Sequence, residues 1–462
     1  MFEFNIDDHK YNKIHFIGIG GVSMSGIAEL LNHYGYQISG SDRDASDTTD
    51  DLSNKGIKIY IGQKASNIED PDLVIYTDAI LDDNEELIRA RELDVPVVSR
   101  GVFLGALMRN YAYSIGVSGS HGKSTTTSMI SKILLDADVD PSVLLGGKLD
   151  RISGNVHCGN SEYMVTEACE YKANILNYYP SMAIILNIDE DHLDFYKDIN
   201  HIVATFIGYM KNLDENSKAI INIDDDNCKL LLDHIRGDII TFGINNPDAT
   251  YRVTNLSFNE NGNPSFSLES ERLEKPVDFE LDIIGRYNVY NAAAAIIACY
   301  ECKIDIDLIK ESIHDYHNLH RRMETIGFYK GAEIKTDYGH HPTEIKNTLQ
   351  ALNEHKKRRL ICVFQPHTYS RTKALLDDFA NSFYDCDEVI VTEIYAAREK
   401  FDPSIHSTDL VAKLVENDVD AKYYKSFDEA RDYIRNIVKD DDMVITTGCG
   451  NPDLLAKMIV ED

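Results

Sequence analysis

The sequence predicts an α/β protein with three domains, each a mainly parallel sheet flanked by helices, and a small antiparallel appendage in the central domain. Three observations support this prediction. The chain has 462 residues, which is enough for three domains that each bury a core. Short β-rich runs alternate with amphipathic stretches along most of the chain. The alternation restarts twice, which predicts domains at residues 1–105, 106–316 and 317–462.

The first domain is expected to be a parallel, doubly wound sheet. Its β-rich runs lie between Lys13 and about Val98 and read IHFIGIG, YQISG, KIYIG, LVIYT and PVVS. Amphipathic stretches such as Met24–Tyr34 and Asn84–Glu92 separate them. A strand followed by a helix and another strand has the spacing of a βαβ unit, so these strands should run parallel.

The central domain begins a second alternation. Its strands are expected at Tyr113–Val117, at Met182–Asn187 and near Ala219 and Ile239. The segment Thr250–Ile284 differs, because it holds three β-rich runs and an Asn261-Gly262 turn of the type found in β-hairpins. We therefore expect an antiparallel appendage there. An Ala-rich helix from Asn288 to about Tyr300 closes the domain.

The third domain starts near Asn318 and repeats the pattern. Its strands are expected at Glu333–Thr336, Leu360–Phe364, Glu388–Val391, Ala421–Tyr424 and Met443–Thr446. Helix-like stretches separate these strands, which again indicates a mainly parallel sheet. The segment near Asp315–Leu319 joins this domain to the central one, and we expect it to act as a hinge.

The composition argues against two classes of partner. The net charge is −31, so neither nucleic acid nor an anionic membrane is an expected partner. The first ten residues are acidic and no apolar run approaches the roughly 20 residues of a membrane span, which predicts a cytoplasmic protein. The eight cysteines lack metal-type spacing and are expected to be reduced. We expect a monomer or a weak homodimer.

The strongest chemical signal is a glycine-rich loop between a strand and a helix. The strand Tyr113–Val117 leads into Gly119, Ser120, His121, Gly122, Lys123, Ser124 and Thr125. Glycines let backbone N–H groups converge on phosphate oxygens, and the helix N-terminus adds partial positive charge. Lys123 can reach the β- and γ-phosphates, and the Ser124 hydroxyl can ligate Mg²⁺. The loop has Val117 where a glycine is usual, but its setting still indicates a nucleoside triphosphate site.

Two further side chains are candidate metal ligands. Glu167 in TEACE and His192 in NIDEDH each follow a predicted strand. We expect these two strands to be adjacent and parallel, so that both side chains face the crevice beside Lys123 and hold Mg²⁺, or alternatively Mn²⁺. Without the neighbouring phosphate loop, His192 would read as a core or helix-capping residue and Glu167 as a strand-end charge.

A second glycine-rich turn follows the first strand of the chain. Its residues are Gly18, Gly20, Gly21, Val22 and Ser23. Ser23 stands where a dinucleotide fingerprint has its third glycine, so the match is incomplete. The turn places a diphosphate at a helix N-terminus, and Asp42 after the next strand can accept a hydrogen bond from a ribose hydroxyl. By itself, such a turn favours NAD.

Six segments resemble the Mur ligase family in their order and intervals: SGSHGKSTTT, TEACE, NIDEDHLD, GRYNVYNAAAA, HRR and TDYGHHPTEI. TDYGHHPTEI and FQPHTYSRT look like the members that add L-alanine. The resemblance implies that the first domain binds UDP-N-acetylmuramate through its glycine-rich turn and Thr77. The second would bind ATP and Mg²⁺, and the third the amino acid. The implied reaction is ATP-dependent amide formation through an acyl phosphate.

The resemblance also implies nucleotide contacts outside the phosphate loop. Asn288 and Asn291 would lie at the start of the adenine-contacting helix. Arg322 would reach from the third domain to the transferring phosphoryl group, and Asp337 would lie on the nucleotide side of TDYGHH. One position departs from the family, since Tyr287 stands where many relatives carry histidine. Read without the family, the two asparagines are a helix cap and a polar turn, and Arg322 is a solvated charge.

In the same way, the resemblance implies a pocket for L-alanine. Tyr338, His340 and Arg371 would form it. Thr368 stands where some relatives carry a second arginine, so the contacts to the alanine carboxylate depart from the family there. The amine must lose a proton before it attacks, and either His340 or His192 is a candidate acceptor.

Three rival functions stay open on the sequence. A sister ligase would join a peptide or a different amino acid to the same UDP-sugar, and only the third-domain pocket distinguishes it. An NAD-dependent oxidoreductase would use the first glycine-rich turn and would change the absorbance at 340 nm. A nucleotide-binding regulator would bind ATP without releasing ADP.

Overall fold

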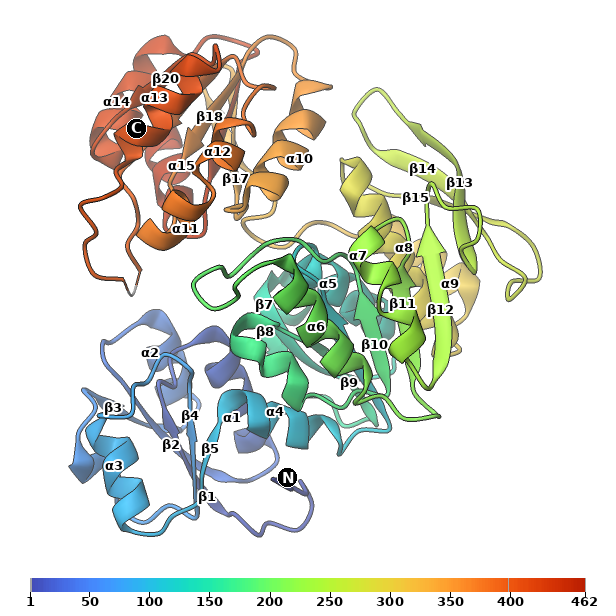
Figure 1. The fold of residues 1–462 in the computed structure, drawn as a ribbon, viewed down its shortest axis with the longest axis vertical. Coiled ribbons are helices and arrows are strands. Elements are labelled where there is room, and N and C mark those ends of the chain that lie inside the picture. Colours follow the sequence, from blue (N-terminus) through green and yellow to red (C-terminus); the bar gives the residue numbers. More distant parts are fainter. Residues whose placement is uncertain (1, 398, 462) are drawn as a thin grey trace.

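The computed structural model describes residues 2–397 and 399–461 of the chain. Figure 1 shows three lobes, and each contains one sheet. The sheets have five, ten and six strands, and most neighbouring strands run parallel. This arrangement confirms the predicted α/β class. In the part of the chain that is described, none of the helices combines the length and apolar character that a membrane crossing requires.

The N-terminal lobe is a parallel sheet with strand order β3-β2-β1-β4-β5. Its strands are β1 (Lys13–Ile17), β2 (Gln37–Asp42), β3 (Lys58–Ile61), β4 (Leu73–Tyr76) and β5 (Val97–Ser99). Its helices are α1 (Val22–His33), α2 (Asp47–Asn54), α3 (Glu85–Glu92), α4 (Arg100–Met108) and the 3₁₀ turn η1 (Ala65–Asn67). β1 pairs with both β2 and β4, so the strand order reverses there. Sheets of this kind bind ligands at such a point, and the turn 18–23 follows β1.

The central lobe has the strand order β15-β14-β13-β12-β11-β10-β6-β9-β7-β8. Its strands are β6 (Tyr113–Ser118), β7 (Ser142–Leu149), β8 (Gly154–His157), β9 (Tyr163–Glu167), β10 (Met182–Ile185), β11 (Lys218–Asn222), β12 (Asp238–Gly243), β13 (Tyr251–Phe258), β14 (Pro264–Glu269) and β15 (Val277–Glu280). Its helices are α5 (Lys123–Asp136), α6 (Ile199–Met210), α7 (Asp226–Lys229), α8 (Arg286–Glu301) and α9 (Ile306–His314). Three 3₁₀ turns complete it: η2 (Asp150–Ile152), η3 (Tyr171–Asn177) and η4 (Leu232–His234).

β6 is the centre of this lobe, because it pairs in parallel with β9 on one side and β10 on the other. The expectation that the strands before Glu167 and His192 are adjacent is therefore wrong, since β6 separates them. The antiparallel appendage is confirmed in β13, β14 and β15. The hairpin of β7 and β8 at the opposite edge was not predicted. Gly146 and Gly147 interrupt the apolar run of β7, and β8 has only four residues, so neither has a clear strand pattern.

The C-terminal lobe has the strand order β16-β17-β21-β18-β19-β20. Its strands are β16 (Glu324–Tyr329), β17 (Ala332–Asp337), β18 (Leu360–Phe364), β19 (Glu388–Val391), β20 (Ala421–Tyr423) and β21 (Met443–Thr447). Its helices are α10 (Pro342–Asn353), α11 (Tyr369–Ala374), α12 (Leu376–Ala380), α13 (Ser407–Glu416), α14 (Phe427–Ile437) and α15 (Pro452–Val460). β16, an edge strand antiparallel to β17, was not predicted. Its register shifts between Thr325 and Gly327, which breaks the regular alternation of a strand.

The N-terminal and central lobes share one hydrophobic core, whereas the C-terminal lobe has two cores of its own. α4 lies between the first two lobes and packs against η3, so closely that a Cβ on Gly105 would lie 1.8 Å from the carbonyl oxygen of Asn177. The expected domain end at residue 105 falls inside this helix. The shared core indicates that the first two lobes move together more readily than either moves with the third.

The linker to the C-terminal lobe is fastened to the central lobe. Leu319 is 2% exposed and packs in a small cluster with apolar residues of β7. The backbone N–H of His320 donates a 3.2 Å hydrogen bond to β7. Arg321 and Met323 then adopt positive φ angles of 61° and 48°. The anchored part of the linker therefore reaches His320, and the hinge expected near Asp315–Leu319 stays a prediction.

Candidate active site between the central and C-terminal lobes

The phosphate loop joins β6 to α5 and depends on glycine at two positions. Gly119 and Gly122 have φ angles of 137° and 85°, which other residues adopt at a cost. A Cβ on Gly122 would also lie 2.3 Å from Oδ1 of Asn291, so α8 approaches the loop too closely for any side chain there. The backbone N–H groups of Ser120 and His121 already donate to Asn187, at 3.1 and 2.8 Å. The predicted phosphate contacts therefore fall to the N–H groups at the N-terminus of α5.

Lys123 is the first residue of α5, and its ammonium group is held at the loop. It donates hydrogen bonds to the carbonyl oxygens of Gly119 and Ser120, the latter at 3.1 Å. It also lies 3.1 Å from Oε1 of Glu170. Burial alone would lower the pKa of Lys123, but the carboxylate of Glu170 raises it above its ordinary value. Lys123 therefore stays charged and can neutralise phosphate oxygens.

Acidic and imidazole groups lie beside this lysine at the carboxyl ends of β9 and β10. Oε1 of Glu167 accepts a 2.7 Å hydrogen bond from the backbone of Gly146. Nε2 of His192 lies 3.7 Å from Oε1 of Glu170. Oε2 of Glu170 is buried, and no described group donates a hydrogen bond to it. An anionic oxygen without a donor suits a hard cation, so Glu170 can contribute to the Mg²⁺ site predicted beside the loop. Among the described residues, three ligand atoms within 4.8 Å of one another are found instead at His121, Asp189 and His341.

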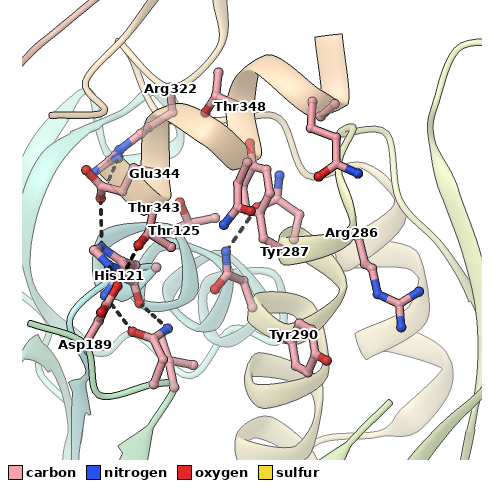
Figure 2. A pocket seen from close by; sticks show the side chains of 18 of the residues that line it. His121, Thr125, Asp189, Arg286, Tyr287, Tyr290, Arg322, Thr343, Glu344 and Thr348 are labelled. Carbon is pink, nitrogen blue, oxygen red and sulfur yellow. Dashed lines mark hydrogen bonds and ion pairs between the residues drawn. The ribbon is translucent and has the colours of Figure 1, made fainter. Parts of the chain in front are cut away.

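A cavity of about 780 Å³ opens next to the loop, a size typical of ligand sites (Figure 2). Seven of the predicted nucleotide residues line it: His121, Gly122, Thr125, Asn288, Asn291, Arg322 and Asp337. Four others belong to the same loop but do not line this cavity: Gly119, Ser120, Lys123 and Ser124. The cavity is bounded by α5 and α8 of the central lobe and by α10 of the C-terminal lobe, so residues of both lobes can reach one ligand.

The two asparagines of α8 are buried beside the phosphate loop. Gly285 is the N-cap of α8, so neither asparagine caps the helix. The side-chain amide of Asn288 donates a 2.8 Å hydrogen bond to the carbonyl of Ile284. The amide of Asn291 donates in turn to Oδ1 of Asn288, at 3.0 Å. These bonds fix both side chains at the cavity wall.

Asp337 ties together the two backbone segments that bring the C-terminal lobe to the cavity. Its carboxylate accepts hydrogen bonds from the N–H groups of Met323, at 2.9 Å, and Gly339, at 2.8 Å. Burial raises the pKa of Asp337 above its ordinary value. The guanidinium of Arg322 stacks over the ring of Tyr338, 5.2 Å from its centroid. Asp337 therefore orients the residues after Arg322 and before His340.

Tyr287, the departure from the family pattern in α8, also joins the two lobes. Its hydroxyl donates a hydrogen bond of 2.8 Å to the sulfur of Met323. Its ring packs against the hydrophobic core of the C-terminal lobe. Tyr287 thereby places an apolar contact at the cavity wall.

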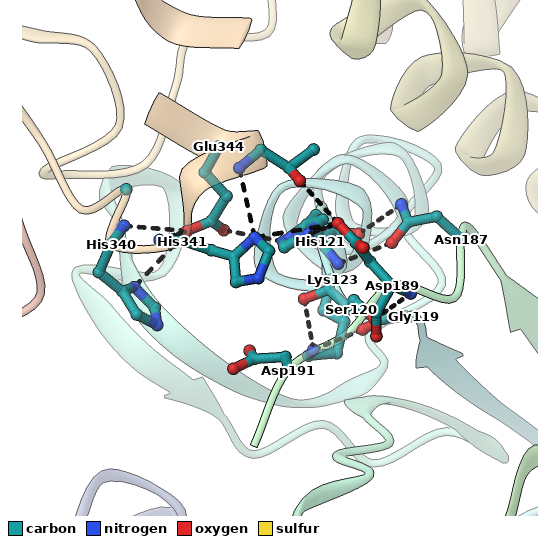
Figure 3. Close-up of polar contacts among 12 residues, drawn as sticks. Gly119, Ser120, His121, Lys123, Asn187, Asp189, Asp191, His340, His341 and Glu344 are labelled. Atoms are coloured by element: carbon teal, nitrogen blue, oxygen red, sulfur yellow. Dashed lines mark hydrogen bonds and ion pairs between the residues drawn. The ribbon is translucent and has the colours of Figure 1, made fainter. Parts of the chain in front are cut away.

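A polar cluster connects the phosphate loop to α10 across the lobe interface (Figures 2 and 3). The ring of His121 lies 3.1 Å from Asp189 and 3.5 Å from Glu344. Burial would lower the pKa of His121, but these two carboxylates raise it to about 9. Thr343 donates to Asp189 at 2.6 Å. His341 uses Nε2 to donate to the carbonyl of Glu190, at 2.8 Å. The cluster is therefore an interlobe hydrogen-bond network.

A smaller cavity of about 230 Å³ lies at the same interface. The three predicted amino-acid residues, Tyr338, His340 and Arg371, all line it, and so does His192. Burial lowers the pKa of His340 to about 3, and Arg371 adds to that effect. His340 is therefore neutral near pH 7 and, with so low a pKa, a poor acceptor for the amine proton.

Arg371 is held in this cavity by groups of both lobes. Its guanidinium donates a 2.8 Å hydrogen bond to Asp191 and lies 3.2 Å from Nδ1 of His367. Thr368 is the N-cap of α11 with a φ angle of 64°, and its hydroxyl accepts a 3.4 Å hydrogen bond from the N–H of Arg371. A threonine at this position cannot supply a second cation, so Arg371 carries the positive charge of this wall.

The glycine-rich turn of the N-terminal lobe is built differently from the phosphate loop. Gly18 has a φ angle of 82°, and a Cβ there would lie 2.5 Å from Cγ2 of Thr77. Oδ2 of Asp42 accepts a 2.9 Å hydrogen bond from the N–H of Gly20, so this carboxylate already supports the turn. Arg100 donates a 3.3 Å hydrogen bond to the hydroxyl of Ser23. The turn, Thr77 and Arg100 lie together.

The unpredicted residues of these sites include Arg100, Glu170, Asp191 and Glu344. Three of them lie inside the segments TEACE, NIDEDH and TDYGHHPTEI, next to residues that were predicted. Each of these three segments contains a carboxylate besides its predicted residue, and that carboxylate was the available signal. Arg100 begins α4 directly after β5, at the carboxyl edge of the first sheet, and its place after a strand was the only sequence clue.

Comparison with known proteins identifies each lobe. Residues 13–112 match the Mur ligase family, catalytic domain, and residues 117–299 match the Mur ligase middle domain. Residues 321–450 match the Mur ligase, glutamate ligase domain. Together these three matches span all three lobes of the chain.

Individual relatives are similar over their whole length. The UDP-N-acetylmuramate–L-alanine ligase of Clostridium novyi is 47% identical to this chain. The alignment covers 100% of this chain and 99% of the relative. The ligase of the same name from Acetivibrio thermocellus is 43% identical, and the alignment covers 99% of this chain and 97% of the relative. The solved UDP-N-acetylmuramate-alanine ligase of Thermotoga maritima is 28% identical, with a TM-score of 0.81 over 97% of this chain and 98% of its own. With matches of this extent, the chain belongs to the Mur ligase family.

Proposed function

We propose that this chain uses ATP to join L-alanine to the lactyl carboxylate of UDP-N-acetylmuramate, a step of peptidoglycan synthesis. The observation that carries this proposal is the segment from Asp337 to Glu344, which lines both cavities. One cavity has a phosphate loop and suits a nucleotide, and the other is small and has a buried arginine that suits a carboxylate. The full-length relatives carry the same activity in their names.

The proposed reaction has two steps. The lactyl carboxylate attacks the γ-phosphorus of ATP in line, so that an acyl phosphate forms and ADP leaves. The alanine amine then attacks the acyl carbon, loses a proton, and phosphate departs from the tetrahedral intermediate. Phosphoryl transfer depends on positioning and on neutralised charge, which Lys123 supplies from the loop and Arg322 from the C-terminal lobe.

We further propose that Ser124 and Glu167 hold one Mg²⁺ and that His192 holds a second. The donor set of hydroxyl, carboxylate and imidazole fits a divalent cation, and the buried oxygen of Glu170 adds an anionic group beside them. Bound Mg²⁺ would neutralise charge on the phosphate oxygens. Around it, Lys123 binds the phosphates and Glu170 keeps that lysine charged and aligned.

The remaining substrate sites follow the cavities and the turn. Asn288 and Asn291 are proposed to contact adenine in the larger cavity, and Tyr338, His340 and Arg371 to hold L-alanine in the smaller one. A cavity of about 230 Å³ is below the usual size for drug-like ligands and therefore suits a small amino acid. The UDP-sugar is proposed to bind the turn formed by Gly18, Gly20, Gly21, Val22 and Ser23, with Asp42 and Thr77 beside it.

The test is phosphate release with ATP, Mg²⁺ and UDP-N-acetylmuramate against each amino acid in turn. We expect L-alanine to give the highest kcat/KM, with a product that has the mass of UDP-N-acetylmuramoyl-L-alanine. Preference for a tripeptide would instead identify a sister ligase. ATP binding without ADP release under every condition would identify a regulator, and an absorbance change at 340 nm with NAD would identify an oxidoreductase.

A further inference from the structure

Asp191 and Arg371 form an ion pair across the lobe interface, inside the smaller cavity. Their side chains are 9% and 12% exposed, and the guanidinium lies 2.8 Å from Oδ1 of Asp191. Asp191 comes from the loop after β10 in the central lobe, and Arg371 comes from α11. Both residues line the cavity. Removing two charges from water is costly, so a buried pair at a ligand site indicates a role in recognition as much as in stability.

The two oxygens of Asp191 have different surroundings. Oδ1 accepts hydrogen bonds from Arg371 and, at 2.6 Å, from the backbone N–H of His192. No hydrogen bond to Oδ2 is found among the described residues, and Nε2 of His192 lies 3.7 Å from it. Oδ1 thus fixes the carboxylate, and Oδ2 can accept hydrogen bonds from a ligand in the cavity.

The other carboxylates that line the cavity are already engaged. Asp194 accepts a 2.9 Å hydrogen bond from the hydroxyl of Tyr171. Glu399 accepts a 3.0 Å hydrogen bond from the backbone N–H of Ser370 and a second from the Ser370 hydroxyl. Asp191 differs from both in its contact with Arg371, so an anion and a cation lie side by side at this place in the cavity.

An α-amino acid carries a carboxylate and an ammonium group on one carbon. Arg371 offers a cation for the first, and Asp191, in contact with it, offers an anion for the second. Given the proposed function, on which this inference rests, we propose that Asp191 accepts the ammonium group of the amino acid and determines that the pocket takes a zwitterion. Arg371 then binds the carboxylate of the substrate while Asp191 binds its ammonium group.

The position of Asp191 also orients the amino nitrogen toward the reacting groups. Asp191 precedes His192, whose ring lies 3.7 Å from Glu170, and Glu170 pairs with Lys123 of the phosphate loop. The amino acid must present its nitrogen to an acyl phosphate formed near that lysine. A carboxylate on the His192 side of the cavity holds the nitrogen on that side, with the carboxylate of the substrate directed toward α11.

The test compares Asp191→Asn with wild type in the full-length protein. Asparagine keeps an oxygen for Arg371 and for the N–H of His192 but removes the negative charge. We expect the KM for L-alanine to rise about ten- to a hundredfold, because hydrogen bonds to charged groups contribute that much to binding. The KM values for ATP and UDP-N-acetylmuramate should stay within about twofold. Glu190→Gln, an exposed neighbour in the same loop, is the matched control and should leave all three unchanged.

A second measurement separates recognition of the ammonium group from displacement of Arg371. Propionate has the methyl and carboxylate groups of alanine but no ammonium, so its inhibition constant should be the same in wild type and Asp191→Asn. Asp191→Glu, which keeps the charge, should retain more affinity for alanine than Asp191→Asn. An alanine KM within twofold of wild type, or equal weakening of alanine and propionate, would overturn the inference. If wild type itself does not use alanine, the proposed function fails instead.

Discussion

The molecule contains two glycine-rich turns with the same local design and different surroundings. The turn 18–23 joins β1 to α1, and the loop 119–124 joins β6 to α5, in each case from a parallel strand to a helix. The second begins its helix with Lys123, which pairs with the buried Glu170. The first begins its helix with the apolar Val22 and is supported by the carboxylate of Asp42. In both, the N-terminus of the following helix can face a phosphate, and we propose that the side chains around each turn decide which phosphate is bound.

The difference also concerns where the positive charge comes from. At the second loop a lysine of the loop and Arg322 of another lobe are available for a transferring phosphoryl group. At the first turn the nearby cation is Arg100, which contacts Ser23 and lies 3.6 Å from Asp78. A partly neutralised arginine and a helix N-terminus suit a diphosphate that is bound but not transferred. We therefore propose that the loop 119–124 takes part in the chemistry and that the turn 18–23 anchors the UDP-sugar.

The largest expected effect is on Lys123. Lys123→Ala removes the buried charge at the β- and γ-phosphates, so turnover should fall by more than about 10³-fold, as for the loss of a key electrostatic donor. Phosphate release measures this, and the thermal unfolding midpoint checks that the fold survives. Near-normal phosphate release would show that Lys123 does not act on the transferring phosphoryl group. The loop 119–124 would then not differ from the turn 18–23 in the proposed way.

Arg322→Ala should have the next largest effect. The guanidinium lines the nucleotide cavity from the C-terminal lobe, so turnover should fall by about 10²- to 10³-fold while ATP binding is largely kept. Single-turnover phosphate release and ATP titration separate the two quantities. Loss of both in equal measure would make Arg322 a residue for binding ATP and would contradict a role in phosphoryl transfer.

Replacement of a proposed metal ligand should have a smaller effect on activity, and that effect should depend on the Mg²⁺ concentration. Glu167→Ala and His192→Ala should each raise the Mg²⁺ concentration for half-maximal activity by at least about tenfold, because each removes a proposed ligand. Activity should recover in part at high Mg²⁺. The matched control is Glu190→Gln, which lies in the same loop as His192 and is exposed. An unchanged Mg²⁺ dependence in both variants would exclude them from the metal site.

A variant of the first turn tests the other side of the comparison. Asp42→Ala removes the acceptor of the Gly20 N–H, a hydrogen bond that contributes on the order of 1 kcal/mol. The KM for UDP-N-acetylmuramate should therefore rise by about fivefold, with the KM for ATP and kcat close to wild type. A fall in kcat with an unchanged KM would show that the turn 18–23 acts in the reaction itself. It would then not differ in role from the loop 119–124.

The sequence was most informative where a strand or a motif can be recognised within one continuous segment. β18 and β19 match their predicted limits, because β18 is an unbroken apolar run and β19 is a short apolar run that follows Glu388. Gly122 and Asn291 were both found in motifs, and both line the larger cavity. β8 and β16 lack that local pattern. The pairs Asp191–Arg371 and His121–Glu344 join distant residues from two lobes, and no local pattern specifies how lobes meet.

The smallest expected effect is a change in the arrangement of the C-terminal lobe. Its contacts with the central lobe combine polar bonds, such as that from Thr343 to Asp189, with a few apolar side chains, such as Tyr287, whereas the first two lobes share a hydrophobic core. Interfaces of this kind allow domain motion, and we expect the linker between the lobes to absorb it. The C-terminal lobe should therefore be the one that moves.

ATP and UDP-N-acetylmuramate should together favour the closed arrangement, because the larger cavity is lined by both lobes and a ligand shifts an equilibrium only by binding one state better. Small-angle scattering should show a modest decrease in the radius of gyration when both are added. Thr343→Val, which removes the donor to Asp189, should raise the radius of gyration of the protein without ligands and leave the ligand-bound value near that of wild type. A radius of gyration that responds neither to ligands nor to Thr343→Val would show that the lobes form a rigid unit. In that case Arg322 is held permanently at the phosphate loop, and the difference between the two turns lies in their own residues alone.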